Sequence, residues 1–262
     1  MQDCPPTPSA TESLLQQIGP IQQTHYGGFW DFTSSSSPTD TAYTNLSLAV
    51  HNDTTYFNQP CGLQMFHLLS HTNGAGGKSL LVDGFAAAAY LKSIAPSFYD
   101  CLQKTKVKSH ASGDREAGPF ENDLMTDGVP VFSGAVRSMF IDTALQTNAS
   151  AMLRDVEEIP QLVRWNNDDR DTQSWSSLEE MEQWYIAARE WNRILKMPEF
   201  LLEVQLEPGT PVIFDNWRYL HGRTSFVGER RMCGGYSKFD SQVSHKLVLS
   251  TIIQDSFSLS LA

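Results

Sequence analysis

The sequence has few cysteines, and nothing in their spacing suggests a covalent or metal-bound framework. Its four cysteines, Cys4, Cys61, Cys101 and Cys233, are scattered over 262 residues without a C-x-x-C pair. Neither a disulfide scaffold nor a structural zinc cluster is therefore indicated.

Long hydrophobic runs and an excess of basic charge are also missing. No apolar stretch approaches the roughly 20 residues of a membrane span, and the opening MQDCPPTPSATE resembles neither a signal peptide nor an Arg-rich transit segment. The formal net charge of −11 argues against nucleic acid and anionic membrane surfaces as partners. We therefore expect a cytoplasmic protein, or a mitochondrial one if a leader precedes this start.

Short apolar runs separated by turns make up much of the chain, which is long enough for one substantial core. The first 25 residues contain a short helical pattern that Gly19-Pro20 interrupts. Residues 112–130 are loop-like, and 135–158 give a weak helical signal. Strands are predicted at 61–71, 80–84, 200–206, 211–216 and 231–239. This pattern predicts a mainly β barrel or sandwich with flanking helices.

Two helices carry clear start signals. Asp83 is placed to cap a helix over 84–94 that stops at Pro96. Ser177 and Glu180 form a capping box at the start of the strongest helical pattern, 176–196. The apolar stripe of that helix consists of Leu178, Met181, Trp184, Tyr185, Ala188, Trp191 and Leu195.

The stretch AVHNDTTYF places His51 and Asp53 two residues apart within an apolar run. On an extended strand this spacing points both side chains to the same face. The pair could be a surface hydrogen bond, a turn feature or two thirds of a metal site. His221, in DNWRYLHGR, could be the third partner, because two imidazoles and one carboxylate are the ligand set of mononuclear non-haem Fe(II) oxygenases.

Arg230 and Arg231 follow His221 by nine and ten residues. A guanidinium binds a carboxylate through two parallel hydrogen bonds, so an arginine here could hold the far carboxylate of a keto acid. A solvated surface pair is the alternative that the residues alone leave open.

Several blocks resemble a known family: HNDTTYFNQPCGLQMFHLL, GGKSLLVDGF, RWNNDDRD, DNWRYLHGRTSF and GERRMCGGY. They are similar to the Fe(II)/2-oxoglutarate dioxygenases of carnitine biosynthesis, trimethyllysine hydroxylase and γ-butyrobetaine hydroxylase. The resemblance implies a double-stranded β-helix (jelly-roll, cupin-like) core. It also implies a lead-in over 1–25 and a TauD/TfdA-like catalytic domain over 26–262, with the family's N-terminal zinc domain absent. Residues 129–153 and the tail after about 240 have no counterpart in the family.

The resemblance also implies roles for particular residues. It implies an iron triad of His51, Asp53 and His221, an Arg230 that pairs with the C5 carboxylate of 2-oxoglutarate, and a Ser79 whose hydroxyl contacts the same carboxylate. Fe(II), 2-oxoglutarate and L-ascorbate are the cofactors that follow from it, with O₂ as the oxidant.

Aromatic residues match the positions of the family's cage for a quaternary ammonium: Tyr26, Trp30, Tyr43 and Tyr236. A trimethylammonium group donates no hydrogen bond and is held by the negative faces of aromatic rings. Without the resemblance, these residues would be read as core or turn positions.

The expected substrate is trimethyllysine, hydroxylated at C3 with release of succinate and CO₂ as the first step of carnitine biosynthesis. Asp40 matches a position that is acidic in trimethyllysine hydroxylases, where it would attract an α-ammonium and repel a bare carboxylate. Asn166 matches a residue that hydrogen-bonds the substrate carboxylate. The alternatives are a butyrobetaine hydroxylase and an inactive homologue that binds a trimethylammonium ligand or a partner subunit. A homodimer is left open.

Overall fold

The computed structural model describes residues 4–34, 44–111, 128–133, 136–137 and 158–238. Its elements follow the chain in the order α1 (Pro8–Ile18), β1 (Phe29–Ser34), β2 (Leu48–His51), β3 (Leu63–Thr72), β4 (Ser79–Asp83), α2 (Gly84–Ile94), α3 (Pro96–Lys104), β5 (Phe132–Ser133), β6 (Val136–Arg137), β7 (Glu158–Ile159), β8 (Leu162–Val163), α5 (Leu178–Ile194), β9 (Leu201–Val204), β10 (Val212–Asp215), β11 (Tyr219–Arg223) and β12 (Glu229–Ser237). None of the helices in these ranges has the length and apolar character needed to cross a membrane.

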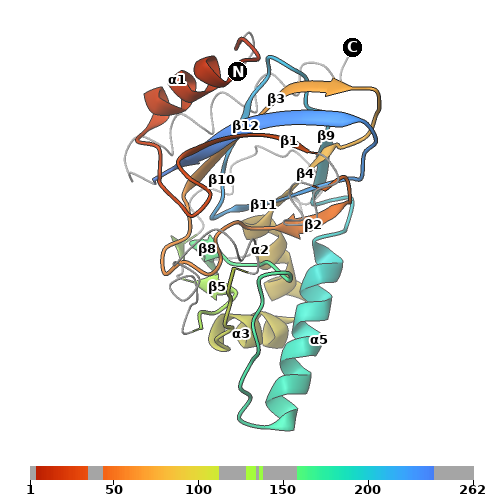
Figure 1. The fold of residues 1–262 in the computed structure, drawn as a ribbon. Coiled ribbons are helices and arrows are strands. Elements are labelled where there is room, and N and C mark those ends of the chain that lie inside the picture. The colour runs from red at the N-terminus through yellow and green to blue at the C-terminus, as the bar shows by residue number, and fades with distance from the viewer. Residues whose placement is uncertain (1–3, 35–43, 112–127, 134–135, 138–157, 239–262) are drawn as a thin grey trace.

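Two antiparallel four-stranded sheets form the body of the molecule (Figure 1). The first has the strand order β1-β12-β3-β10, and the second has the order β2-β11-β4-β9. Both orders bring early and late strands of the chain together, as a double-stranded β-helix requires. The predicted mainly β fold with a jelly-roll core is confirmed.

Helices cover the outer sides of this body. In Figure 1, α2, α3 and α5 gather beneath the second sheet, whereas α1 lies beside the first. Leu15 of α1 is fully buried in a cluster with Leu63, Met65 and Ile213, so the first helix belongs to the core of the sheet body.

Most of the predicted elements appear close to their expected bounds. The side chain of Asp83 accepts hydrogen bonds from the backbone N–H groups of Phe85 and Ala86 and caps α2 as predicted. The hydroxyl of Ser177 accepts from the N–H of Glu180 at the start of α5. One helix, α3, was not predicted: Pro96 ends α2 and also begins α3, where the fixed φ of proline suits a first helical turn.

The predicted apolar stripe of α5 is wrong at two positions. Trp184, Ala188 and Trp191 are buried, but Leu178 and Tyr185 are 66% and 45% exposed. The stripe is wider than the face that α2 and α3 can cover. The ring of Tyr185 instead lies under the guanidinium of Arg170, 5.5 Å from its central carbon.

The weak helical signal over 135–158 is wrong where the structure describes that stretch. Val136–Arg137 and Glu158–Ile159 form the short strands β6 and β7, which pair antiparallel. The residues between them lie outside the described ranges, as do most of the loop-like residues 112–130.

Candidate metal centre and active site

His51 and Asp53 lie at the end of β2. His51 is the last residue of the strand, and Asp53 follows in the turn. On the neighbouring strand β11, His221 is directly opposite His51 in the antiparallel register. The pairing of an early and a late strand therefore brings together three residues that are far apart in sequence.

The three side chains form one compact group. Nε2 of His51 lies 3.3 Å from Oδ1 of Asp53, and Nε2 of His221 lies 3.7 Å from Oδ2 of the same carboxylate. One potential ligand atom from each residue falls within 4.8 Å of the others. Two imidazole nitrogens and one carboxylate oxygen facing a common point match the ligand set of a mononuclear Fe(II) site.

The hydrogen bonding of His51 fits a metal ligand. Its Nδ1 lies 2.7 Å from the backbone oxygen of Ala49. A carbonyl oxygen only accepts, so Nδ1 carries a proton, and Nε2 is left as the nitrogen that can coordinate a metal once it gives up its own proton. Among the described residues, Nδ1 of His221 has no hydrogen-bond partner.

Electrostatics couple the three groups strongly. Burial acts to lower the pKa of His51, but the hydrogen bond and charge of Asp53 outweigh it and raise that pKa to about 9. Burial lowers the pKa of His221 to about 4. Burial acts to raise the pKa of Asp53, but the two imidazoles outweigh it and hold that pKa well below its usual range. The carboxylate is therefore ionised, as a metal ligand must be.

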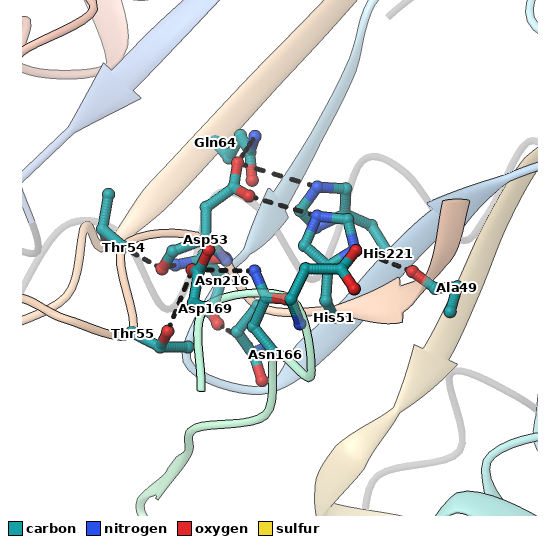
Figure 2. A network of polar contacts seen from close by, with 12 residues as sticks. Ala49, His51, Asp53, Thr54, Thr55, Gln64, Asn166, Asp169, Asn216 and His221 are labelled. Carbon is teal, nitrogen blue, oxygen red and sulfur yellow. Dashed lines mark hydrogen bonds and ion pairs between the residues drawn. The ribbon is translucent and has the colours of Figure 1, made fainter. Parts of the chain in front are cut away.

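Two neighbouring side chains on adjacent strands orient the carboxylate of Asp53. Tyr236 donates its hydroxyl hydrogen to Oδ2 over 2.7 Å, and Nε2 of Gln64 donates to the same oxygen. Gln64 on β3 and Tyr236 on β12 are paired in register, which explains why both reach one atom. Figure 2 shows Gln64 above Asp53, with the two histidines to one side.

A pair of buried amides fixes the backbone on either side of Asp53. Nδ2 of Asn52 donates to the oxygens of Asn216 and Tyr219, and its Oδ1 accepts from the N–H of Trp165. The side chain of Asn216 accepts from the N–H of Asp53 and donates to its oxygen. No sequence pattern pointed to Asn216, and the side chain of Asn52 is directed to these backbone groups and not to the metal group.

The two threonines after Asp53 have separate roles. Thr54 adopts a φ of 56°, and its hydroxyl donates to the oxygen of Asp53 and accepts from the N–H of Cys61. The hydroxyl of Thr55 donates to the carboxylate of Asp169 at 3.1 Å. The first threonine therefore shapes the turn that carries a ligand, and the second connects this turn to the loop that follows Trp165.

Arg230 is 2% exposed and has no carboxylate partner among the described residues. Its guanidinium lies 5.0 Å from the ring centre of Phe226 and contacts the sulfur of Met232 at 3.8 Å, while Nε has no partner in the described part of the chain. Burial lowers the pKa of this group. Gly77, with a φ of 67°, leaves room for the guanidinium, because a Cβ there would lie 3.0 Å from its central carbon.

A small cavity lies between the two sheets. It is lined by Ser79, by His221 and by apolar side chains from both sheets, among them Phe66, Leu81, Val204 and Phe214. The predicted hydroxyl residue and a predicted ligand therefore share one cavity wall.

The predicted aromatic positions are only partly described. Trp30 on β1 packs against Phe66 with ring centres 5.4 Å apart, and Phe66 lies 5.4 Å from the ring of His221. Tyr26 is 38% exposed, and its ring centre is 3.9 Å from that of His25. The structure also places the hydroxyl of Tyr236 on Asp53. Tyr43 and Asp40 lie outside the described residues.

Other residues near the group were missed. Tyr56 is buried, and its hydroxyl lies 3.3 Å from Nε2 of His25. Asn166, a predicted substrate residue, donates from Nδ2 to Asp169 at 2.8 Å. Burial, followed by repulsion from Asp53, raises the pKa of Asp169 to about 7. In the sequence the DD pair after Asn166 gave no sign that one of its carboxylates faces inward.

Curated relatives share much of this sequence. A trimethyllysine dioxygenase from Neurospora crassa is 40% identical over 269 residues, covering 90% of this chain and 52% of the relative. The human mitochondrial trimethyllysine dioxygenase is 39% identical over 236 residues, covering 90% of this chain and 51% of the relative. Human gamma-butyrobetaine dioxygenase is 26% identical over 254 residues, covering 95% and 59%. The chain thus spans about half the length of the curated trimethyllysine dioxygenases that it matches.

Solved structures share the fold at low sequence identity. An asparagine oxygenase in complex with Fe(II), 3-hydroxyasparagine and succinate superposes with a TM-score of 0.57 at 15% identity, covering 90% of this chain and 69% of that one. The non-haem iron oxygenase OrfP, with Fe and α-ketoglutaric acid, gives 0.58 at 14% identity, covering 92% and 68%.

The family match extends over both sheets and every strand that carries a candidate ligand. The taurine catabolism dioxygenase TauD, TfdA family matches residues 1–236, which include the metal group, Ser79 and Arg230. The chain therefore belongs to the TauD/TfdA dioxygenase family.

Proposed function

We propose that this chain hydroxylates trimethyllysine at C3 in a reaction that depends on Fe(II) and 2-oxoglutarate. The observation that carries the proposal is the convergence of His51, Asp53 and His221 on one point of a barrel that also buries an arginine without a carboxylate partner among the described residues. In balanced form, one substrate C–H, O₂ and 2-oxoglutarate yield the alcohol, succinate and CO₂.

His51, Asp53 and His221 would hold the iron. Their donor set suits Fe(II), and the hydrogen bond from His51 to Ala49 leaves Nε2 available as a ligand. When bound, iron with the 2-oxo acid supplies the oxidising chemistry that side chains lack. The contribution of the protein is orientation: Gln64 and Tyr236 hold the carboxylate of Asp53, and the two buried amides hold its backbone.

Arg230 would hold 2-oxoglutarate by its C5 carboxylate, with Ser79 as a further hydrogen-bond donor. A buried guanidinium without a polar partner is costly, and a carboxylate is the group that its planar fork fits best. The cavity between the sheets is lined by both His221 and Ser79, which supports a diacid that lies beside the metal group and extends toward Ser79.

Trimethyllysine is favoured over butyrobetaine because this chain is 39% identical to the human trimethyllysine dioxygenase and 26% identical to the human gamma-butyrobetaine dioxygenase. Trp30, Tyr26 and Tyr236, with Tyr43, would surround the trimethylammonium group. Asn166 would donate to the substrate carboxylate, and Asp40 would attract the α-ammonium. Because the human relative is named as mitochondrial, a mitochondrial location is part of the proposal. Imaging of the tagged protein tests it.

One parallel incubation tests the proposal. The 262-residue chain is mixed with Fe(II), 2-oxoglutarate, L-ascorbate and O₂, and trimethyllysine and butyrobetaine are offered separately. Mass spectrometry should show one added oxygen atom on trimethyllysine and an equal amount of succinate. Oxygen on butyrobetaine alone would overturn the choice of substrate. Absence of both products, together with absence of the iron–2-oxoglutarate charge-transfer band, would instead indicate an inactive homologue.

A further inference from the structure

Asp169 is an inward-facing acidic residue that none of the roles above uses. Its Oδ2 accepts hydrogen bonds from Thr55 at 3.1 Å and from Asn166 at 2.8 Å. Figure 2 shows it between these two residues, on the Asn166 side of the metal group. Its charge raises the pKa of His51, and the charge of Asp53 in turn raises the pKa of Asp169.

The basic side chains next to Asp169 in the chain and in the fold interact with other groups. Arg164 donates to the backbone oxygens of Thr55, Phe57 and Asn58. Arg170 lies over the rings of Trp184 and Tyr185, and His110 pairs with Asp171. Within the described ranges, Asp169 therefore has hydrogen-bond donors but no ion-pair partner in contact; the charge of the His51 imidazole acts on it from a greater distance and lowers its pKa less than burial and Asp53 raise it.

We propose that Asp169 accepts the primary α-ammonium of an amino-acid substrate, next to Asn166, and so selects trimethyllysine over ligands without that group. This inference rests on the proposed function and adds a specificity-determining residue to it. It adds a carboxylate on the loop after β8 (Leu162–Val163) to Asp40 as a partner of that ammonium.

The hydrogen-bonding capacity of the two side chains fits both charged groups of an α-amino acid. Both donors to Asp169 use Oδ2, which leaves Oδ1 without a partner among the described residues and available to an ammonium. The amide of Asn166 has two N–H bonds and gives one to Asp169, so the second is available to a carboxylate. In the protein, the carboxylate of Asp169 lies beside the amide donor of Asn166, and in the substrate the α-ammonium lies beside the α-carboxylate, so the two pairs match.

The trimethylammonium end of the substrate cannot replace the α-ammonium at Oδ1 of Asp169. A trimethylammonium group has no N–H to donate to Oδ1 and is bound by ring faces. A purely structural role is also a poor explanation for a carboxylate here. A neutral amide could connect Thr55 to Asn166 equally well, without the burial and repulsion that raise the pKa of Asp169.

The test compares two ligands that differ only in the α-amino group. Trimethyllysine and 6-(trimethylammonio)hexanoate are titrated by calorimetry, without O₂, into protein loaded with Fe(II) and 2-oxoglutarate. The wild-type protein should bind trimethyllysine more tightly. Asp169→Asn should weaken trimethyllysine about 10- to 100-fold, the range for one hydrogen bond to a charged group, and should change the affinity of the analogue much less.

Two further variants separate specificity from folding. Asp168→Asn removes the same charge from the adjacent, exposed position and should keep the wild-type ratio of affinities. Asp169→Glu keeps the charge and should retain part of the preference for trimethyllysine. The charge-transfer band of bound iron and 2-oxoglutarate should persist in all three variants.

Equal weakening of both ligands by Asp169→Asn, an unchanged affinity ratio, or a wild-type protein that binds both ligands alike would each overturn the inference. The calorimetric result does not depend on turnover. A protein that prefers trimethyllysine but adds no oxygen to it would contradict the proposed function and leave the role of Asp169 intact.

Discussion

The two ends of the candidate active site are built in opposite ways. At the metal end, Asp53 faces two imidazoles and accepts hydrogen bonds from Tyr236 and Gln64. At the other end, the guanidinium of Arg230 is buried against Phe226 and has no oxygen acceptor among the described residues.

This contrast shows which part of the site is complete before a ligand arrives. The proposed metal ligands are held by the protein in a nearly finished arrangement, which reduces the ordering that binding requires. Among the described residues the charge of Arg230 has no carboxylate partner, and a buried charge without a partner is unfavourable. We therefore expect 2-oxoglutarate to stabilise the folded chain measurably, because a ligand that binds only the native state raises its stability.

The largest effect is expected at the metal end. His221→Ala removes one of three proposed ligands, and losing even an outer-shell partner of a metal ligand costs about 10- to 100-fold in metal affinity. We expect iron affinity to fall by more than about 100-fold, with loss of the iron–2-oxoglutarate band and of succinate formation. Titration of Fe(II) under anaerobic conditions measures this. His71→Ala, on β3 and outside the metal group, is the control and should bind iron like the wild type.

Arg230→Met tests the opposite end. Removing one partner of a desolvated charge pair costs about 2–5 kcal/mol, so the KM for 2-oxoglutarate should rise by about two to three orders of magnitude while iron binding persists. The thermal stability of the ligand-free protein should be unchanged or higher, because the variant removes a buried charge that has no carboxylate partner among the described residues.

Arg231 offers a matched control for that variant. It lies one residue further along β12, is largely exposed and pairs with Asp31 at 2.7 Å. Arg231→Met should leave the KM for 2-oxoglutarate unchanged. A clear loss of stability in Arg230→Met would contradict the view that its charge awaits a ligand.

The sequence was most informative where function depends on residue type. His51, Asp53, His221 and Arg230 were singled out by the family blocks that contain them, because the residues alone also allowed a surface pair and a solvated arginine. Short apolar runs predicted β3, β4, β9, β10 and β12 but not β1 or β11. The supporting contacts could not be found in this way. The side chains of Gln64 and Tyr236 meet Asp53 only through the register of β3 and β12, which no local pattern specifies.

The apolar stripe of a helix was also a less reliable guide to the structure than the residues that cap its start. The start of α5 depends on Ser177 and Glu180, which are close in sequence, and it was predicted correctly. The buried face of the same helix depends on what packs against it, and so Leu178 and Tyr185 were wrongly placed in the core.

A smaller effect, on stability more than on chemistry, is expected behind the metal end. Asn52→Ala deletes the hydrogen bonds to Asn216, Tyr219 and Trp165 and leaves buried groups unsatisfied. The free energy of unfolding should fall by about 1–3 kcal/mol, measured by denaturant titration of the metal-free protein. Asn45→Ala, at an exposed position, should change it much less. If Asn52→Ala kept full stability, the metal end would not be preorganised by its amides.

The smallest effect is expected at Ser79, which separates charge from hydrogen bonding within the 2-oxoglutarate end. Its place in the cavity wall that also contains His221 puts a hydroxyl along the proposed path of the diacid. A single hydrogen bond to a ligand contributes about 0.5–1.5 kcal/mol net, so Ser79→Ala should raise the KM for 2-oxoglutarate by about 2- to 10-fold and leave kcat nearly unchanged. Steady-state succinate formation measures both constants. An increase as large as that of Arg230→Met would mean that the hydroxyl, and not the buried guanidinium, provides most of the binding energy at this end.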